Sequence, residues 1–158
     1  MVGLMIAIII ANIILYKTNK KLSKSQMLHI WLFTTVFQMT FDIYVSLKFQ
    51  SYWYFTKSID WQTLPVYTLL VPPVNIIFLN FYPWKAPLSK RILYLICWNL
   101  GILIYESITL LPEPWGYFHY GWWTIWHSVV INPILFFILL KYYKWICNLE
   151  KKPVMNKA

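Results

Sequence analysis

Charged residues are scarce in this sequence, and acidic residues are the scarcest. Only 12% of the 158 residues are charged, with five acidic against fourteen basic side chains. A soluble domain carries about a quarter charged residues, so this composition cannot cover a water-facing surface. The length leaves room for one domain. The shortage of charge therefore excludes an ordinary soluble domain and favours a chain that sits in lipid.

Glycine and cysteine are also few, and known catalytic signatures are missing. There are four glycines and two cysteines, Cys97 and Cys147. The cysteines form neither a CxxC pair nor a Cys/His set at zinc spacing. We find no nucleophile elbow, Walker loop, HExxH or dinucleotide fingerprint. We therefore expect no structural disulfide, no metal site and no cofactor.

What the chain does contain is long apolar runs. Hydrophobic residues make up 59% of it and aromatic residues 20%. Crossing about 30 Å of hydrocarbon takes roughly 20 apolar residues as a helix. The sequence predicts an all-α, polytopic membrane protein, one domain over residues 1–158. Five transmembrane helices are expected, at residues 2–16, 27–49, 64–82, 92–111 and 122–140. A basic cytoplasmic tail is expected at residues 141–158. The first run is short, so four spans remain the alternative.

The basic residues predict the orientation. With five spans, all but Lys48 and Lys57 fall on one side of the membrane. Because positive charge is retained in the cytoplasm, we expect the N-terminus outside and the C-terminus inside the cell membrane. The lysine clusters and the net charge of +9 fit anionic lipid headgroups better than nucleic acid. Expected partners are membrane lipids, with a homo-oligomer or other membrane proteins besides.

Two outer loops and two helices have unusual sequences. The loops at 51–55 and 112–120 are aromatic, which predicts a belt at the membrane interface or, alternatively, the roof of a pocket. Pro72-Pro73 and Asn132-Pro133 lie mid-way along their helices. Each proline frees a carbonyl that needs another partner. We interpret both as packing kinks, and the alternative is the broken helices of a transporter site. Asn75 is the expected hydrogen-bond partner of the carbonyl that is freed near Pro72.

Three titratable residues fall inside predicted spans. Asp42, Glu106 and His127 each lie roughly 22 Å above the inner boundary, counted at 1.5 Å per residue. Such groups are costly in a membrane and tend to be functional. Gln38 and Asn99 extend the polar faces of their helices. We predict that the second, fourth and fifth helices are neighbours and share one polar pocket. Three roles stay open: a packing network, a proton-handling or substrate site, or carboxylates snorkelling to the interface.

The first helix carries small residues at four-residue spacing. Gly3, Ala7 and Ala11 form a small-xxx-small stripe. Such a stripe lets two helix backbones approach closely. We expect this face to pack against another helix rather than lipid.

Several motifs resemble a family of small, uncharacterised multi-pass proteins from spore-forming Gram-positive bacteria. They are the aromatic outer loop, Pro72-Pro73, Asn80-Phe81-Tyr82-Pro83, Tyr105-Glu106 and Gly121-Trp122-Trp123. The resemblance implies a membrane protein and brings no catalytic residues. The leading hypothesis is a non-enzymatic integral membrane protein, either a complex subunit or a small binding or sensing module. The runner-up is an oligomeric proton-coupled transporter or channel component, and a membrane enzyme acting on lipid or wall precursors is third.

Overall fold

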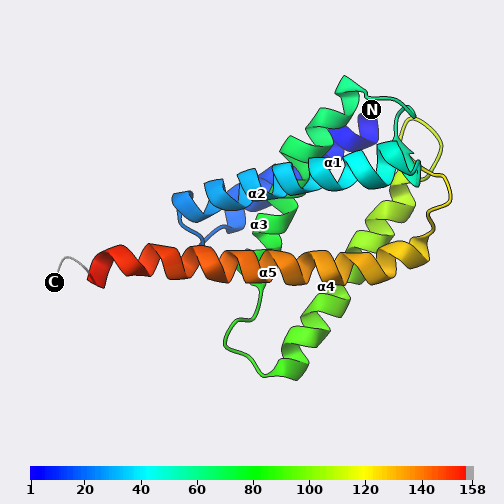
Figure 1. Ribbon diagram of the computed structural model, residues 1–158. Coiled ribbons are helices and arrows are strands. Elements are labelled where there is room, and N and C mark those ends of the chain that lie inside the picture. Colours follow the sequence, from blue (N-terminus) through cyan, green and yellow to red (C-terminus); the bar gives the residue numbers. More distant parts are fainter. Residues whose placement is uncertain (156–158) are drawn as a thin grey trace.

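The computed structural model describes residues 1–155, with side chains through residue 151. The fold is mostly helical (Figure 1), as the sequence predicts. The five α-helices are α1 (Val2–Thr18), α2 (Lys24–Asp42), α3 (Val71–Phe81), α4 (Leu88–Thr109) and α5 (Ile125–Met155). The shorter elements are η1 (Ile43–Lys48), η2 (Trp61–Thr63), η3 (Val66–Leu70), β1 (Tyr52–Tyr54) and β2 (Phe118–Tyr120).

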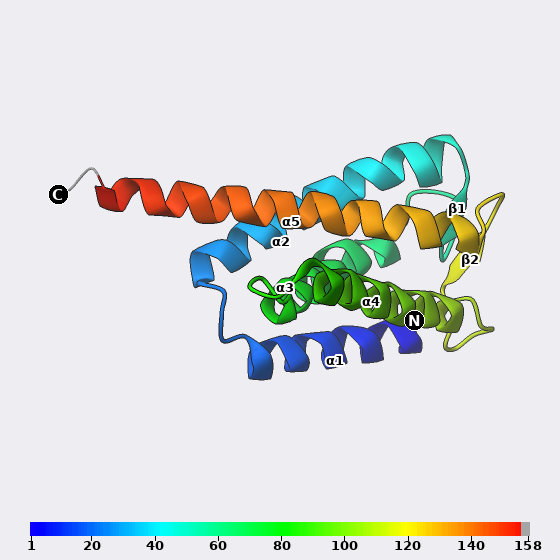
Figure 2. The same ribbon diagram turned by 90° about the horizontal axis from the view of Figure 1, so that it is seen from below.

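The molecule has two chemically different ends. Figure 2 shows the α1–α2 turn, the α3–α4 loop and the C-terminal end of α5 on one side, which we call the basic end. The N-terminus and the two strands lie on the other side. The strands pair antiparallel, and we call this side the ribbon end. The two aromatic loops of the sequence thus meet as one β-ribbon.

Four helical segments are long and apolar enough to cross a membrane. They are Lys24–Lys48, Trp61–Phe81, Leu88–Thr109 and Ile125–Lys151. Their length and composition indicate a multi-pass membrane protein. The shorter helix α1 is also apolar. It reaches from the ribbon end, where Gly3 N donates to Pro114 O, to the basic end, where Thr18 O accepts from Asn80 Nδ2.

Several helix boundaries differ from those predicted. The expected helix 27–49 becomes π-helical at Ile43, and 64–82 contains the π-turn η3 ahead of its two prolines. The expected helix 122–140 begins later and continues to Met155. Residues 141–155, which the sequence analysis assigned to a basic tail, therefore continue the helix. Lys157, also assigned to that tail, lies outside the described residues. At 31 residues, α5 is about 46 Å long, well beyond a bilayer core.

Helix α3 is the centre of the packing. Its residues from Ile76 to Asn80 are all buried, and Phe78 is fully enclosed. The Phe78 ring lies 5.5 Å from that of Tyr94 and 4.6 Å from that of Phe136, between centroids. Aromatic rings bury large areas and stack at such distances. This contact joins α3 to α4 and α5.

Helix α1 packs along α3 and η3 through the stripe that the sequence singles out. Ala11 is buried and Ala7 packs against the same cluster, which includes Val66 and Leu70. Gly3 lies beneath the loop before β2, where an added Cβ would be 2.1 Å from Trp115 O. All three small residues thus lie on the protein-facing side of α1.

At both proline breaks, an asparagine of another helix donates to a carbonyl that a proline frees. Pro73 cannot donate to Leu69 O, and Asn12 Nδ2 of α1 donates to that carbonyl at 3.0 Å. Pro133 likewise leaves Val129 O, and Asn99 Nδ2 of α4 donates to it at 3.3 Å. An unpaired buried carbonyl would be costly. These bonds therefore fix the breaks in place.

The prediction that Asn75 bonds the carbonyl freed near Pro72 was wrong. Asn75 Nδ2 donates instead to Thr34 Oγ1 of α2 at 3.2 Å. The prediction assumed a partner within the same helix. Three residues beyond Pro72, this amide points to the neighbouring helix α2, whereas Leu69 O, the carbonyl that Pro73 frees, accepts from Asn12 of α1.

Candidate binding cavity

The β-ribbon has two different faces. Tyr52 pairs with Tyr120 and Tyr54 with Phe118, whereas Trp53 pairs with His119. Side chains alternate across a strand, so the first two pairs share one face. Tyr52 and Phe118 are buried on that face, and His119 is exposed on the other. The ribbon therefore covers the ends of the helices with a layer of aromatic rings.

Glu106 of α4 is held by two hydroxyl groups that end on the same oxygen. Its Oε1 accepts from Tyr120 Oη at 2.5 Å and from Ser128 Oγ at 2.6 Å. The Ser128 oxygen in turn accepts from Trp123 Nε1 at 2.9 Å. Residues from α4, the ribbon and α5 thus form one hydrogen-bonded chain. Because both donors use Oε1, the second oxygen Oε2 takes part in neither bond.

Asp42, the last residue of α2, is the more deeply buried carboxylate. It is 3% exposed, and its Oδ1 accepts from Tyr52 Oη and, at 3.2 Å, from Gln38 Nε2. Its Oδ2 has no hydrogen-bond partner among the described residues. The π-turn η1 starts at the next residue, and π-turns are frequent at functional sites. An unpaired buried carboxylate oxygen is rare enough to need an explanation.

His127 does not join the two carboxylates. Its ring is exposed, its Nδ1 accepts from Thr124 N at 3.0 Å, and the ring lies 5.1 Å from that of Trp123. Among the described residues, no hydrogen bond links it to Asp42 or Glu106. The helix begins at residue 125, so residue 127 belongs to its first turn and acts as a cap. Ser128, about 100° further around the helix, makes the contact with Glu106 that was expected of His127.

Asn99 serves the helix break rather than a shared polar pocket. Its amide nitrogen donates to Val129 O, and its Oδ1 has no partner among the described residues. Glu106 lies two turns further along α4 and faces the cavity. The two residues therefore have different neighbours.

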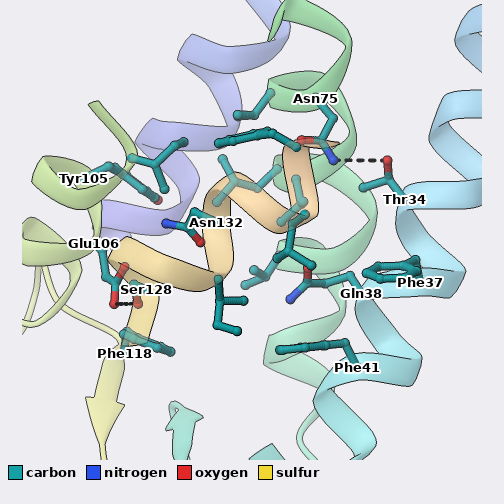
Figure 3. Close-up of a pocket in the computed structure, with 18 of the residues that line it drawn as sticks. Thr34, Phe37, Gln38, Phe41, Asn75, Tyr105, Glu106, Phe118, Ser128 and Asn132 are labelled. Carbon is teal, nitrogen blue, oxygen red and sulfur yellow. Dashed lines mark hydrogen bonds between the residues drawn. The ribbon is translucent and has the colours of Figure 1, made fainter. Parts of the chain in front are cut away.

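A cavity of about 250 Å³ lies between α2, α3, α4 and α5 beneath the ribbon. Figure 3 shows its polar groups converging from these helices, with Glu106 and Ser128 from one side and Gln38, Thr34 and Asn75 from the other. Ten lining residues are aromatic: Phe33, Phe37, Phe41, Tyr52, Tyr54, Tyr105, Tyr117, Phe118, Trp123 and Phe136. This is the usual composition of a small-molecule site, an apolar wall with few polar groups.

Asn132 marks the middle of the cavity wall on α5. Its side chain lines the cavity beside the Pro133 break, and its Nδ2 has no partner among the described residues. Figure 3 shows this amide between Glu106 and the Asn75 side chain. A buried donor without a partner costs free energy. It therefore adds a second unused polar atom to the same region.

The tyrosines of the ribbon end are held neutral. Burial, and then the Asp42 carboxylate, raises the pKa of Tyr52 well above its ordinary value. Burial, and then the hydrogen bond to Glu106, raises the pKa of Tyr120. A tyrosine that keeps its proton remains a donor. The two hydroxyl groups can thus hold the carboxylates over the whole physiological pH range.

Tyr52 and Tyr120 are site residues that the sequence analysis did not assign. The signal for the tyrosines was present, since Tyr-Trp-Tyr and Phe-His-Tyr alternate as half-buried strands do. The pairing between these strands is distant in sequence and could not be seen.

No group of three or more His, Cys, Asp or Glu residues among those described could hold a metal ion.

The chain was also compared with known proteins. No protein-family model, no curated protein and no solved structure matches it. The functional argument therefore depends on the geometry of this chain alone.

Proposed function

We propose that this chain is a small binding module of the cell membrane, which holds a small, largely apolar molecule in the cavity beneath the β-ribbon. In this proposal five helices cross the bilayer, the basic end lies in the cytoplasm and the ribbon end lies outside. The cavity is then near the outer face. The proposal is non-enzymatic. The resemblance to uncharacterised membrane proteins of spore-forming bacteria is compatible with it and adds no activity.

The charge distribution supports the orientation. Lysines and the arginine gather in the α1–α2 turn, the α3–α4 loop and the last turns of α5, which all lie at the basic end. Charge of this kind is retained in the cytoplasm and attracted to anionic headgroups. The long α5 extends this basic surface beyond a bilayer core, where it is available to lipid headgroups or a protein partner.

The cavity carries the functional part of the proposal. The cavity of about 250 Å³ is walled by ten aromatic side chains, and such a wall is typical of small-molecule sites. Its unpaired polar atoms at Asn132 and Asp42 lie at or next to the wall. A bound molecule with an apolar body would cover the aromatic wall.

The sealed helix breaks favour a fixed site over alternating access. In transporters, broken helices expose unpaired backbone groups to the substrate. Here Asn12 and Asn99 donate to Leu69 O and Val129 O, the carbonyls that Pro73 and Pro133 free. The breaks consequently tie α3 to α1 and α5 to α4. This argues for binding or sensing rather than for transport.

Filling the cavity should displace whatever it holds. Leu135 lines the cavity, whereas its neighbour Ile134 is 49% exposed. We expect the protein purified in mild detergent to show a discrete bound mass by native mass spectrometry. Leu135→Trp should lose that mass, and Ile134→Trp should keep it. Bare protein in every sample, or equal retention by both variants, would refute the binding function.

A further inference from the structure

The cavity wall has charge of one sign only. Glu106 is its single carboxylate, and none of the described residues that line it is Lys, Arg or His. An anionic ligand would meet a like charge and find no cation to pair with. In a medium of low dielectric such a contact is strongly unfavourable.

The Glu106 carboxylate is only half used by the protein. Tyr120 and Ser128 both donate to Oε1. No hydrogen bond among the described residues reaches Oε2, yet this atom is not among the unpartnered atoms that are sealed from solvent. Oε2 is therefore not sealed from solvent, and Glu106 lines the cavity. A neutral apolar ligand would cover it and leave it without a partner, which is costly.

Aromatic rings stand next to this carboxylate. Trp123 is joined to it through Ser128, and the Phe118 ring lies 5.6 Å from that of Tyr120. Figure 3 shows Phe118 on the same side of the cavity as Glu106 and Ser128. The faces of aromatic rings attract cations, most strongly where water is excluded. A carboxylate oxygen and aromatic faces thus converge on one place in the wall.

We propose that the cavity selects a lipophilic cation, a molecule with an apolar body and one positively charged nitrogen that lies against Glu106. The proposal rests on the proposed function, because it names the class of ligand for the same cavity. The nitrogen takes the place at Oε2, and the apolar body fills the space between α2, α3 and α5.

Two probes of equal shape test this on the unaltered protein. Phenyltrimethylammonium and tert-butylbenzene differ by one nitrogen and its positive charge. Binding is measured by titration calorimetry with the protein in nanodiscs of zwitterionic lipid, and empty nanodiscs give the background. We expect the cation to bind about tenfold more tightly or better, as a desolvated cation–π and carboxylate contact provides.

Two variants locate the charge that is responsible. Glu106→Gln keeps the shape of the side chain and removes its charge. It should therefore weaken the binding of the cation about tenfold and leave the affinity for tert-butylbenzene unchanged. Glu113→Gln, in an exposed loop, should change neither. Should Glu106→Gln fail to fold, the comparison of the two probes on the unaltered protein still decides.

The outcomes separate the two proposals. Equal affinity for both probes, or an unchanged cation affinity in folded Glu106→Gln, overturns the lipophilic-cation proposal while a binding cavity stands. Binding of neither probe, together with the absence of a bound mass in native spectra, overturns both.

Discussion

Tyr52 and Tyr120 face each other across the β-ribbon, and each donates its hydroxyl to a carboxylate of a different helix. Tyr52 reaches Asp42 at the end of α2, and Tyr120 reaches Glu106 near the end of α4. The ribbon therefore ties together two helices that it covers. It also holds the roof of the cavity in register with its wall.

Removing either hydroxyl should destabilise the fold. We expect Tyr52→Phe and Tyr120→Phe each to lower the free energy of unfolding by about 1–3 kcal/mol, because a carboxylate oxygen loses a donor. The larger loss should occur at Tyr52, since Asp42 is almost fully buried. SDS unfolding titrations followed by circular dichroism give the values. Tyr16→Phe, at a side chain 90% exposed, is the matched control and should be neutral.

Alkaline pH should lower the free energy of unfolding through the ionisation of Tyr52. The pKa of Tyr52 is raised in the folded state, first by burial and then by Asp42, from an ordinary value of 10.0. The unfolded chain loses this proton above about pH 10 while the folded chain keeps it. Stability is thus fully present below pH 10 and falls as the pH rises further. Tyr52→Phe should make this decline shallower; an unchanged slope would contradict the assignment.

The bond from Asn99 to Val129 O should matter only while Pro133 is present. Asn99→Leu should cost about 1–3 kcal/mol, because it uncovers the carbonyl that the proline frees. Pro133→Ala restores a backbone amide for that carbonyl. In this background Asn99→Leu should cost clearly less, and a double-mutant cycle measures the difference. An equal cost in both backgrounds would show that Asn99 acts through other contacts.

Two glycines should respond in opposite ways to alanine. A Cβ at Gly116 would lie 1.6 Å from Leu111 O, whereas one at Gly101 meets nothing within 4 Å. Gly116→Ala should therefore disrupt the turn that leads into β2 and lower the yield of folded protein. Gly101→Ala, in the interior of α4, should stabilise it by about 0.5–1 kcal/mol. Thermal unfolding of the two proteins in detergent makes the comparison.

The helical membrane class could be predicted because it depends on length and apolar content alone. Four of the predicted spans recur as long apolar helices. The end of α5 could not be placed from the apolar run, since Lys141 and Lys144 continue the helix without being apolar. Apolar content marks the part of a helix that lipid can cover, which is shorter than the helix itself.

The site was predicted in outline and missed in its contacts. Asp42 and Glu106 were expected at one level, and both lie where their helices meet the ribbon. Counting residues gives depth along a helix, but it gives neither the rotation of the helix nor the partners from distant loops. That is why His127 was expected to share the pocket with Glu106, and why the hydrogen bonds from the tyrosines to the carboxylates were not predicted.

The central claim is that the ribbon and its cavity face outward while the basic end lies in the cytoplasm. Single cysteines introduced into a variant without native cysteines test it in intact cells with a membrane-impermeant maleimide. Position 2 lies next to the N-terminus at the ribbon end, and Lys57 lies over the ring of Trp53 in β1. Position 20 lies in the α1–α2 turn, and all three side chains are exposed. The account predicts labelling of Val2→Cys and Lys57→Cys in intact cells, and of Lys20→Cys only after permeabilisation. Labelling of Lys20→Cys alone in intact cells would contradict it.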